Sequence, residues 1–218
     1  MINGIRLKVC GLTSLVDAGL ANGIGADYLG FIFYPKSPRY VTVEQYGAMS
    51  PRLPARGKIA VCVEPEKKEL NELAGLDFDF IQIHFPAATP LERIVAWSQT
   101  TGAERLWLAP KLPPERDVEA AWLPLAGAFL LDAFHPDKFG GTGQTGDWVK
   151  FRRHLEAHPQ KQWILSGGLG PVNIGPALAE TGARMVDVNS GVERSPGVKD
   201  PVKLRALVEG LRRTRARL

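Results

Sequence analysis

Short apolar stretches alternate with longer amphipathic stretches along the chain. The short stretches are rich in β-branched and aromatic residues, which is typical of β-strands. They span residues 5–10, 28–33, 59–63, 80–84, 106–109, 129–132, 163–166 and 185–189. Because amphipathic stretches lie between them, the pattern predicts a chain built from eight strand–helix units.

Helix-start signals support this pattern. Ser14 and Thr42 stand where N-caps are expected, each at the head of a capping box or a sequence close to one. Pro90 is expected at the first position of a helix, and Asp147 at an N-cap. The helix expected near residues 115–122 has the weakest pattern. The last helix carries an apolar stripe with the spacing of a helix packed on a core, made up of Leu204, Leu207, Val208 and Leu211.

Alternating strands and helices indicate a parallel sheet, which is either a closed barrel or an open doubly wound sheet. Buried parallel strands are usually apolar throughout, but several strands predicted here carry polar residues near their carboxyl ends. Residues two apart on a strand point to the same face. The polar residues are Lys8 and Cys10, Gln82 and His84, Asp187 and Asn189, with Asp132 at the end of its own strand.

Polar faces of this kind converge at the carboxyl-end rim of a closed barrel, where barrel enzymes keep their active sites. The pattern therefore favours the closed barrel. No shift in composition and no low-complexity segment divides the chain. We predict a single α/β domain over residues 1–218, an eight-stranded parallel (β/α)8 TIM barrel with outer helices.

Composition is that of an ordinary globular protein, with 44% hydrophobic and 23% charged residues. The cysteines are Cys10 and Cys62, and no C-x-x-C motif or His/Cys cluster occurs, so we expect neither a disulfide framework nor a metal site. The chain begins without the apolar segment of a signal peptide, and no apolar run is long enough to span a bilayer. We expect a cytoplasmic protein with no membrane partner.

The formal net charge of +4 suits an anionic small substrate. Basic residues at the C-terminus raise nucleic acid as an alternative partner, and these are Arg212, Arg213, Arg215 and Arg217. Cations at the end of a helix also complement the helix dipole. We interpret them as a solvated helix end and expect no nucleic-acid partner, while the sequence leaves a monomer and a homodimer equally open.

Two glycine-containing loops follow the last two predicted strands. Glycines let the backbone approach a phosphate closely, and backbone N–H groups at such loops bind anions. The loops after strands seven and eight are the usual phosphate site of these barrels. We therefore predict a phosphate site formed by Gly167, Gly168, Asn189, Ser190 and Gly191.

Three further side chains are candidates for chemistry at the rim. Asp132 ends a strand and is either a general acid or base, or a cap for the following loop. Cys10 also ends a strand, and Lys8 on the same face would favour its thiolate, although a lone buried cysteine is usually only packing. Arg39 follows the second strand and is either a clamp for a substrate carboxylate or a surface arginine. Cys62 is expected to be packing.

Taken together, these motifs resemble those of the phosphoribosylanthranilate isomerase family, in the same order from the first strand to the last helix. The matching segments are residues 8–11, 30–33 with 37–39, 82–84, 131–132 with 140–143 and 147–148, 166–169, and 187–193 with 196–200. The joint match is specific, whereas each segment alone is not.

The resemblance implies a cofactor-free Amadori rearrangement of N-(5-phosphoribosyl)anthranilate in tryptophan biosynthesis. It implies that Asp132 is the general acid, which protonates the ring oxygen, and that Cys10 is the base, which removes the C2′ proton. An acidic limb set by Cys10 and a basic limb set by Asp132 would then bound the pH–rate profile. The resemblance also assigns Arg39 to the anthranilate carboxylate. The remaining expected substrate contacts are Lys8, Gln82, His84, Gly141 and Asp187.

Four residues depart from the family pattern, namely Phe85, Gly146, Glu64 and Asn189. Phe85 is expected either to pack beneath the fourth helix near Leu91 and Ile94, or to lean over the rim and cover the anthranilate ring. Rival functions include the histidine-pathway Amadori isomerase, which relies on paired aspartates, and indole-glycerol phosphate synthase, whose lysine–glutamate pattern is not evident. A non-catalytic phosphate-binding barrel is a third alternative, which retention of Cys10 and Asp132 disfavours.

Overall fold

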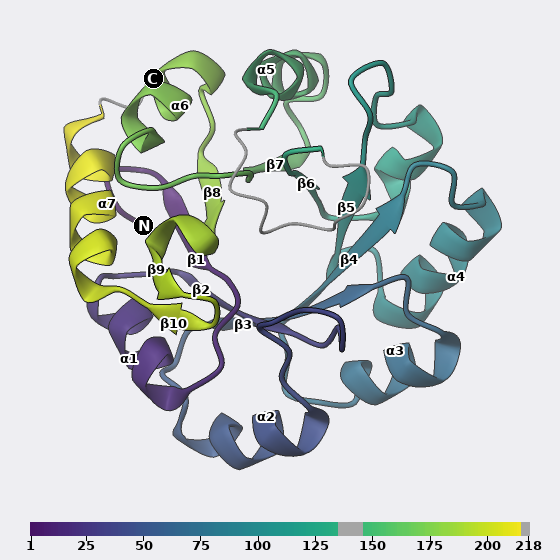
Figure 1. Cartoon of the computed structure of the whole chain (residues 1–218). Coiled ribbons are helices and arrows are strands. Elements are labelled where there is room, and N and C mark those ends of the chain that lie inside the picture. The colour runs from purple at the N-terminus through teal and green to yellow at the C-terminus, as the bar shows by residue number, and fades with distance from the viewer. Residues whose placement is uncertain (135–145, 215–218) are drawn as a thin grey trace.

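The computed structural model describes residues 1–134 and 146–214. Eight parallel strands close into a barrel in the order of the chain, with β8 hydrogen-bonded to β1 (Figure 1). This confirms the predicted (β/α)8 barrel and excludes the open sheet. The strands are β1 (Arg6–Val9), β2 (Tyr28–Ile32), β3 (Gly57–Val63), β4 (Phe80–Pro86), β5 (Leu106–Lys111), β6 (Ala128–Leu131), β7 (Gln162–Leu165) and β8 (Met185–Val188).

A ring of helices surrounds the strands (Figure 1). The α-helices of the described residues are α1 (Leu15–Gly23), α2 (Val43–Met49), α3 (Lys67–Ala74), α4 (Leu91–Thr101), α5 (Trp148–Ala157), α6 (Ile174–Thr181) and α7 (Pro201–Arg213). Short 3-10 helices are η1 (Ser50–Arg52), η2 (Ala120–Leu125) and η3 (Ser190–Val192), and a small hairpin after β8 consists of β9 (Glu193–Ser195) and β10 (Val198–Lys199). No helix among the described residues is long and apolar enough to cross a membrane.

The helix-start signals hold at most positions. Ser14 and Asp147 each accept a backbone hydrogen bond at an N-cap, and Thr42 and Gln45 form a full capping box. Pro90, by contrast, occupies the N-cap itself, because its backbone ψ of 141° is extended and the helix begins one residue later.

The helix expected near residues 115–122 is wrong as an α-helix. That stretch ends in the 3-10 helix η2, which contains Pro124. Proline has no N–H to donate and its ring clashes with the preceding turn, so an α-helix does not continue through it. The stripe predicted on the last helix is confirmed, since all four of its residues on α7 are buried.

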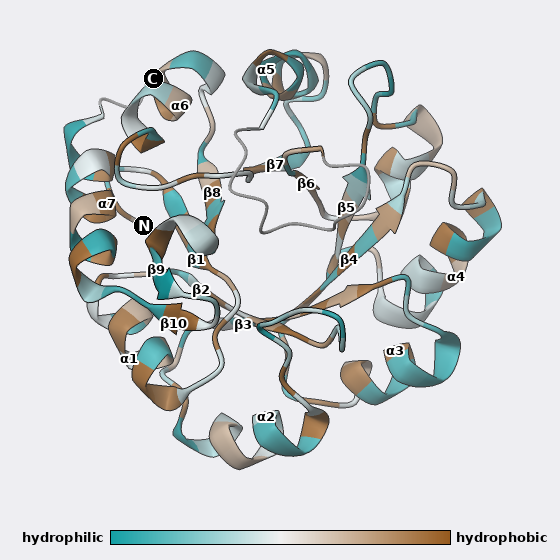
Figure 2. Ribbon diagram, in the orientation of Figure 1, coloured by the Kyte–Doolittle hydropathy of each residue, from teal (hydrophilic) through white to brown (hydrophobic). Residues whose placement is uncertain are grey.

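The core has two compartments, one on each face of the strands. Inside the barrel, Tyr28, Phe80 and Trp107 pack against one another with ring centroids 4.8 to 5.9 Å apart. They lie toward the amino ends of their strands, so they fill that end of the lumen. The outer compartment lies between the strands and the surrounding helices. Figure 2 shows that α7 carries both hydrophobic and hydrophilic residues, as expected of a helix that packs on the core with one side only. Strand alternation thus separates an inner face from an outer face.

Candidate active site

A cavity of about 460 Å³ opens at the carboxyl end of the barrel. Of the residues predicted as site residues, it is lined by Cys10, Arg39, Gln82, His84, Asp132, Gly167, Gly168, Asp187, Asn189, Ser190 and Gly191. Lys8 lies beneath its floor, fully buried, and Gly141 lies outside the described residues. Among the described residues, no group of three or more His, Cys, Asp or Glu side chains is arranged to hold a metal ion.

The floor of the cavity is a chain of hydrogen bonds that starts at Lys8. Its Nζ donates to Asp187 Oδ2 at 2.7 Å and to Gln82 Oε1 at 2.9 Å. Strand register brings the first pair together, because Lys8 and Asp187 are partners in the β1–β8 ladder. Burial lowers the pKa of Lys8, but Asp187 and Cys10 together outweigh it and the net shift is upward. Lys8 is therefore a buried cation.

The orientation of Lys8 fixes the protonation of His84. Lysine only donates, so Gln82 turns its oxygen to Lys8 and its amide nitrogen to His84 Nε2, 2.7 Å away. His84 Nε2 must then accept, which places the ring proton on Nδ1. Burial, helped by the Lys8 charge, lowers the pKa of His84 to about 3. His84 is thus a neutral imidazole across the physiological range.

Asp187 retains an unused acceptor. Its Oδ2 takes the Lys8 bond, whereas its buried Oδ1 has no hydrogen-bond partner among the described residues. A buried acceptor without a partner costs free energy, on the order of 1–3 kcal/mol. Asp187 lines the cavity, so Oδ1 is available to a hydroxyl or N–H group of a ligand.

Cys10 lies directly after β1, and Lys8 is two residues back on the same inner face. Burial raises the pKa of the Cys10 thiol, although the Lys8 ammonium lowers it. Lys8 therefore favours the thiolate, as expected, but desolvation outweighs this effect and the net shift of the Cys10 pKa is upward. Gly30 on β2 makes room for both side chains, since a Cβ there would lie 3.0 Å from Cys10 Sγ and from Lys8 Cε.

Asp132 follows β6 on the far side of the same cavity. Its Oδ1 accepts a hydrogen bond from the Ala133 N–H at 2.8 Å. Burial raises the pKa of Asp132 to about 6, even though that bond lowers it. The two expected catalytic groups thus have pKa values in the opposite order to the one the sequence suggested, with the carboxyl group below the thiol.

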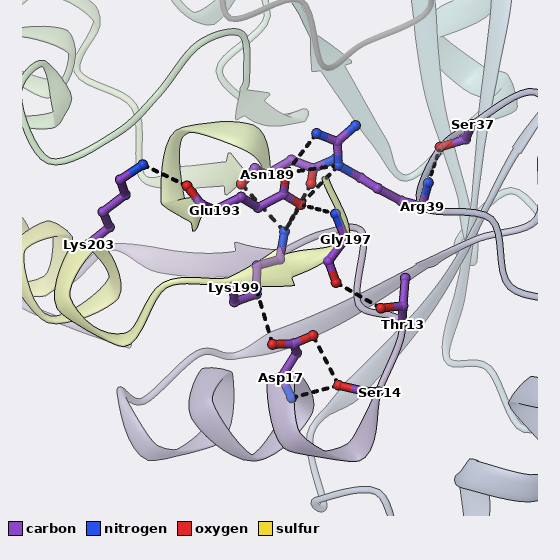
Figure 3. A network of polar contacts seen from close by, with 10 residues as sticks. All are labelled: Thr13, Ser14, Asp17, Ser37, Arg39, Asn189, Glu193, Gly197, Lys199 and Lys203. Atoms are coloured by element: carbon purple, nitrogen blue, oxygen red, sulfur yellow. Dashed lines mark hydrogen bonds and ion pairs between the residues drawn. The ribbon is translucent and has the colours of Figure 1, made fainter. Parts of the chain in front are cut away.

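Arg39 is neither a surface arginine nor a free clamp. Its side chain is only 9% exposed, and its Nε and Nη2 donate to both oxygens of Glu193 at 2.7 to 3.2 Å (Figure 3). Glu193 Oε1 also accepts from Lys199 Nζ at 2.8 Å. Sequence reasoning did not single out Glu193 and Lys199 individually, because charged residues in a loop are normally solvated.

The glycine loops are constrained by their own packing as well as by any ligand. Gly167 and Gly168 have φ values of +93° and +59°, a region that favours glycine. A Cβ on Gly191 would lie 2.1 Å from Leu169 O. Since close backbone contacts alone require glycine at Gly191, the glycines are weaker evidence for phosphate than the sequence pattern suggested.

The chain matches the model of the N-(5′-phosphoribosyl)anthranilate isomerase family over residues 7–210. A Pseudomonas putida protein of that name is 38% identical over 95% of this chain and 98% of its own length. The chain belongs to this family. It is an isomerase of tryptophan biosynthesis.

Solved structures of family members share the fold closely. The phosphoribosylanthranilate isomerase of Thermotoga maritima has a TM-score of 0.81 and 32% identity, with 95% of this chain and 98% of that chain covered. Another family structure, with a TM-score of 0.76, 31% identity and the same coverage, is a complex with reduced 1-(o-carboxyphenylamino)-1-deoxyribulose 5-phosphate.

The departures from the family pattern have separate physical consequences. Glu64 has a φ of +43°, a region that asparagine tolerates better than glutamate, so this backbone position is strained. Asn189 Oδ1 accepts from Lys199 at 3.0 Å. Gly146 allows a close approach, because a Cβ there would lie 2.8 Å from Ser166 O. None of these removes Cys10 or Asp132 from the cavity.

Phe85 packs on the outer face of β4. It is fully buried and meets Trp97 and Trp122 edge-on, at centroid distances of 5.6 and 5.4 Å. The expectation that it packs beneath α4 is confirmed, with these two rings as its aromatic neighbours, whereas Leu91 is 40% exposed. The alternative, a ring that covers the anthranilate, is wrong, because Phe85 and His84 point to opposite faces of the strand.

Proposed function

We propose that this chain converts N-(5-phosphoribosyl)anthranilate to 1-(2-carboxyphenylamino)-1-deoxyribulose 5-phosphate by general acid–base catalysis, with Asp132 as the acid and Cys10 as the base. The observation that carries the proposal is that β1 and β6 bring these two titratable groups to one cavity. An acid and a base on different walls can act on one sugar in turn.

The proposed reaction moves protons within the substrate and involves no redox change. Asp132 donates its proton to the furanose ring oxygen, the bond from that oxygen to C1′ breaks, and a protonated Schiff base forms with the anthranilate nitrogen. The Cys10 thiolate removes the C2′ proton, and the electron pair neutralises the iminium nitrogen to give the enolamine. In the tautomerisation to the C2′ ketone, C1′ gains a proton and the C2′ hydroxyl loses one, which returns Cys10 to the thiolate and Asp132 to the acid, directly or through solvent. Substrate and product are therefore isomers.

The environment of each group supports its role. The pKa of Asp132, raised by burial to about 6, lets the carboxyl group hold a proton nearer to neutral pH than an exposed aspartate does. Burial raises the pKa of Cys10, and Lys8 and Lys199 lessen that shift without reversing it, so the thiolate is the minor form of Cys10 at neutral pH. The productive enzyme is therefore the form in which Asp132 carries the proton and Cys10 does not.

The substrate contacts follow from where its charges lie. We assign the anthranilate carboxylate to Arg39 and the phosphate to the loops of Gly167 and Gly168 and of Asn189, Ser190 and Gly191. Asp187 Oδ1 and Gln82 lie on the floor for polar groups of the sugar, above Lys8. A cytoplasmic location, a monomeric or homodimeric state and the absence of a nucleic-acid partner stay predictions. Arg212 and Arg213 do lie in the last turn of α7, as a helix-end interpretation requires.

A direct assay tests the proposal. Freshly prepared phosphoribosylanthranilate is mixed with the purified protein, and the loss of anthranilate fluorescence is followed. We expect saturable turnover that inorganic phosphate inhibits competitively. An absence of turnover in folded wild-type protein would reject the function, and turnover without an effect of Cys10→Ala and Asp132→Asn would reject only the mechanism.

A further inference from the structure

A buried cluster of charges lies between the cavity wall and the β9–β10 hairpin. It consists of Arg39, Glu193 and Lys199, and we call it the wall cluster (Figure 3). The side chains of Glu193 and Lys199 are 4% and 0% exposed. Two cations share one carboxylate, so the cluster has a net charge of +1. Buried ion pairs of this kind are often no more stabilising than well-packed apolar residues, so stability alone does not explain the cluster.

Both cations of the wall cluster connect to the cavity. Arg39 lines the cavity, and its Nη1 has no hydrogen-bond partner among the described residues. Lys199 Nζ donates to Asn189 Oδ1 at 3.0 Å, and Asn189 also lines the cavity. Arg39 and Asn189 meet over Gly11, where a Cβ would lie 2.6 Å from Arg39 Cδ and 2.5 Å from Asn189 Oδ1. Gly11 directly follows Cys10, so the cluster borders the expected base.

Of the wall cluster, Arg39 lines the cavity, whereas Glu193 does not. It holds Arg39 through two parallel hydrogen bonds, a geometry that fixes the plane of the guanidinium group. Its own position is fixed by Lys199 Nζ and by the Gly197 N–H, which donates to Oε1 at 3.3 Å. Burial raises the pKa of Glu193, but the hydrogen bonds from Arg39 and Lys199 outweigh it and the net shift is downward.

We propose that Glu193 is a positioning residue for substrate recognition: it holds Arg39 so that the free Nη1 faces the carboxylate of the anthranilate ring. This rests on the proposed substrate. A long arginine side chain loses much rotamer freedom when it is ordered, and Glu193 orders it before the substrate arrives. By balancing only one of the two cations, Glu193 also leaves the wall positively charged toward an anionic ligand.

The test compares two substrates, one with the carboxylate and one without. Wild type and Glu193→Gln are assayed with N-(5-phosphoribosyl)anthranilate and with N-(5-phosphoribosyl)aniline, and the ketose products are separated by chromatography. We expect Glu193→Gln to lower kcat/KM for the anthranilate adduct about tenfold to a hundredfold, mainly through KM. For the aniline adduct we expect a loss of less than about threefold. A merely structural role would lower both values alike.

Glu193→Gln leaves two buried cations without a carboxylate, so a second variant guards against misfolding. The double variant Glu193→Gln with Lys199→Met removes one charge of each sign, and Lys199→Met alone keeps the Arg39–Glu193 pair. We expect the double variant to lose the preference for the carboxylate and Lys199→Met to retain it. Glu209→Gln, which removes an exposed carboxylate from its pair with Arg213 on α7, is the matched surface control and should keep both values.

The outcomes separate the two proposals. If folded Glu193→Gln or the double variant loses equally on both substrates, or on neither, the positioning role is rejected while the isomerase function stands. If wild type turns over neither adduct, the proposed function fails first.

Discussion

The inner and outer faces of the same barrel strands serve different purposes, and Cys10 and Cys62 show the contrast. Both are buried free thiols, and burial raises the pKa of both. Cys10 lies next to the hydrogen-bond network of Lys8 and lines the cavity. Cys62 points outward from β3, and its Sγ lies 3.7 Å from the carbonyl oxygen of Gln82. Burial alone therefore does not distinguish the proposed base from a packed thiol, whereas the neighbours of the thiol and its access to the cavity do.

The same contrast recurs within β4. His84 faces inward and belongs to the polar floor, while Phe85 faces outward between two tryptophans. Adjacent residues of one strand are thus expected to affect different properties, His84 the active site and Phe85 the stability of the fold. Changes to the polar residues at the carboxyl end of the inner face are expected to alter catalysis with little loss of stability, and changes on the outer face the reverse.

The largest effect is expected from the paired cysteine variants. Cys10→Ala should lower kcat by roughly 10²–10⁴, the usual contribution of a positioned base, whereas Cys62→Ala should leave kcat near the wild-type value. Steady-state fluorescence assays of both variants measure this. A normal kcat in Cys10→Ala would show that Cys10 is not the base. Equal losses of kcat in Cys10→Ala and Cys62→Ala would show that the two faces do not differ in function.

Asp132→Asn keeps the shape of the acid and removes its proton. We expect a comparable loss of kcat with a much smaller change in KM, because proton donation matters in the transition state. A loss confined to KM would instead make Asp132 a binding residue.

The pH dependence of kcat/KM follows from the two pKa values. The pKa of Asp132, about 6, lies below the pKa of Cys10. Between these two pKa values the enzyme with one proton shared by the pair dominates, and this population contains the productive form. Activity should rise with pH through about 6 and fall as Cys10 ionises in alkaline solution. Asp132→Asn should lose the limb near pH 6 in its residual activity. A limb that stays in place there would assign it to another group.

On the outer face, Phe85→Ala should lower the free energy of unfolding by about 3–5 kcal/mol, since it empties a fully buried aromatic site. Its kcat/KM should be nearly unchanged at a temperature where the variant is folded. Urea unfolding and the fluorescence assay together measure both quantities. A change in kcat/KM without a change in stability would show that the outer face contributes to the site.

The smallest effect is expected at the phosphate loop. Gly168→Ala places a methyl group where the backbone is expected to approach the phosphate, and we expect KM to rise by up to about tenfold. Gly182→Ala is the matched control, because Gly182 has a similar φ of +68° at the end of α6 and lies outside the cavity lining. Equal KM values in the two variants would argue against a phosphate at Gly168.

Much of the fold follows from the sequence, because alternation of side chains is a local property. The predicted strand ends lie within two residues of those observed, and the inward positions on β1, β4 and β8 follow from it directly. The wall cluster does not, because Arg39 and Glu193 are 154 positions apart and only the closed barrel brings them together. The net upward shift of the Cys10 pKa does not follow from the sequence either, because desolvation depends on how the cavity is enclosed.

The most direct test of the central claim is a crystal structure of this protein with the reduced product analogue that one of its relatives holds. We expect the carboxylate at Arg39 Nη1, the phosphate between the loops of Gly168 and Ser190, and the C2′ atom beside Cys10 Sγ. We expect Asp132 on the other side of the sugar. A reversed ligand, with the phosphate at Arg39 and C2′ away from Cys10, would rule out the proposed roles of Arg39 and Cys10.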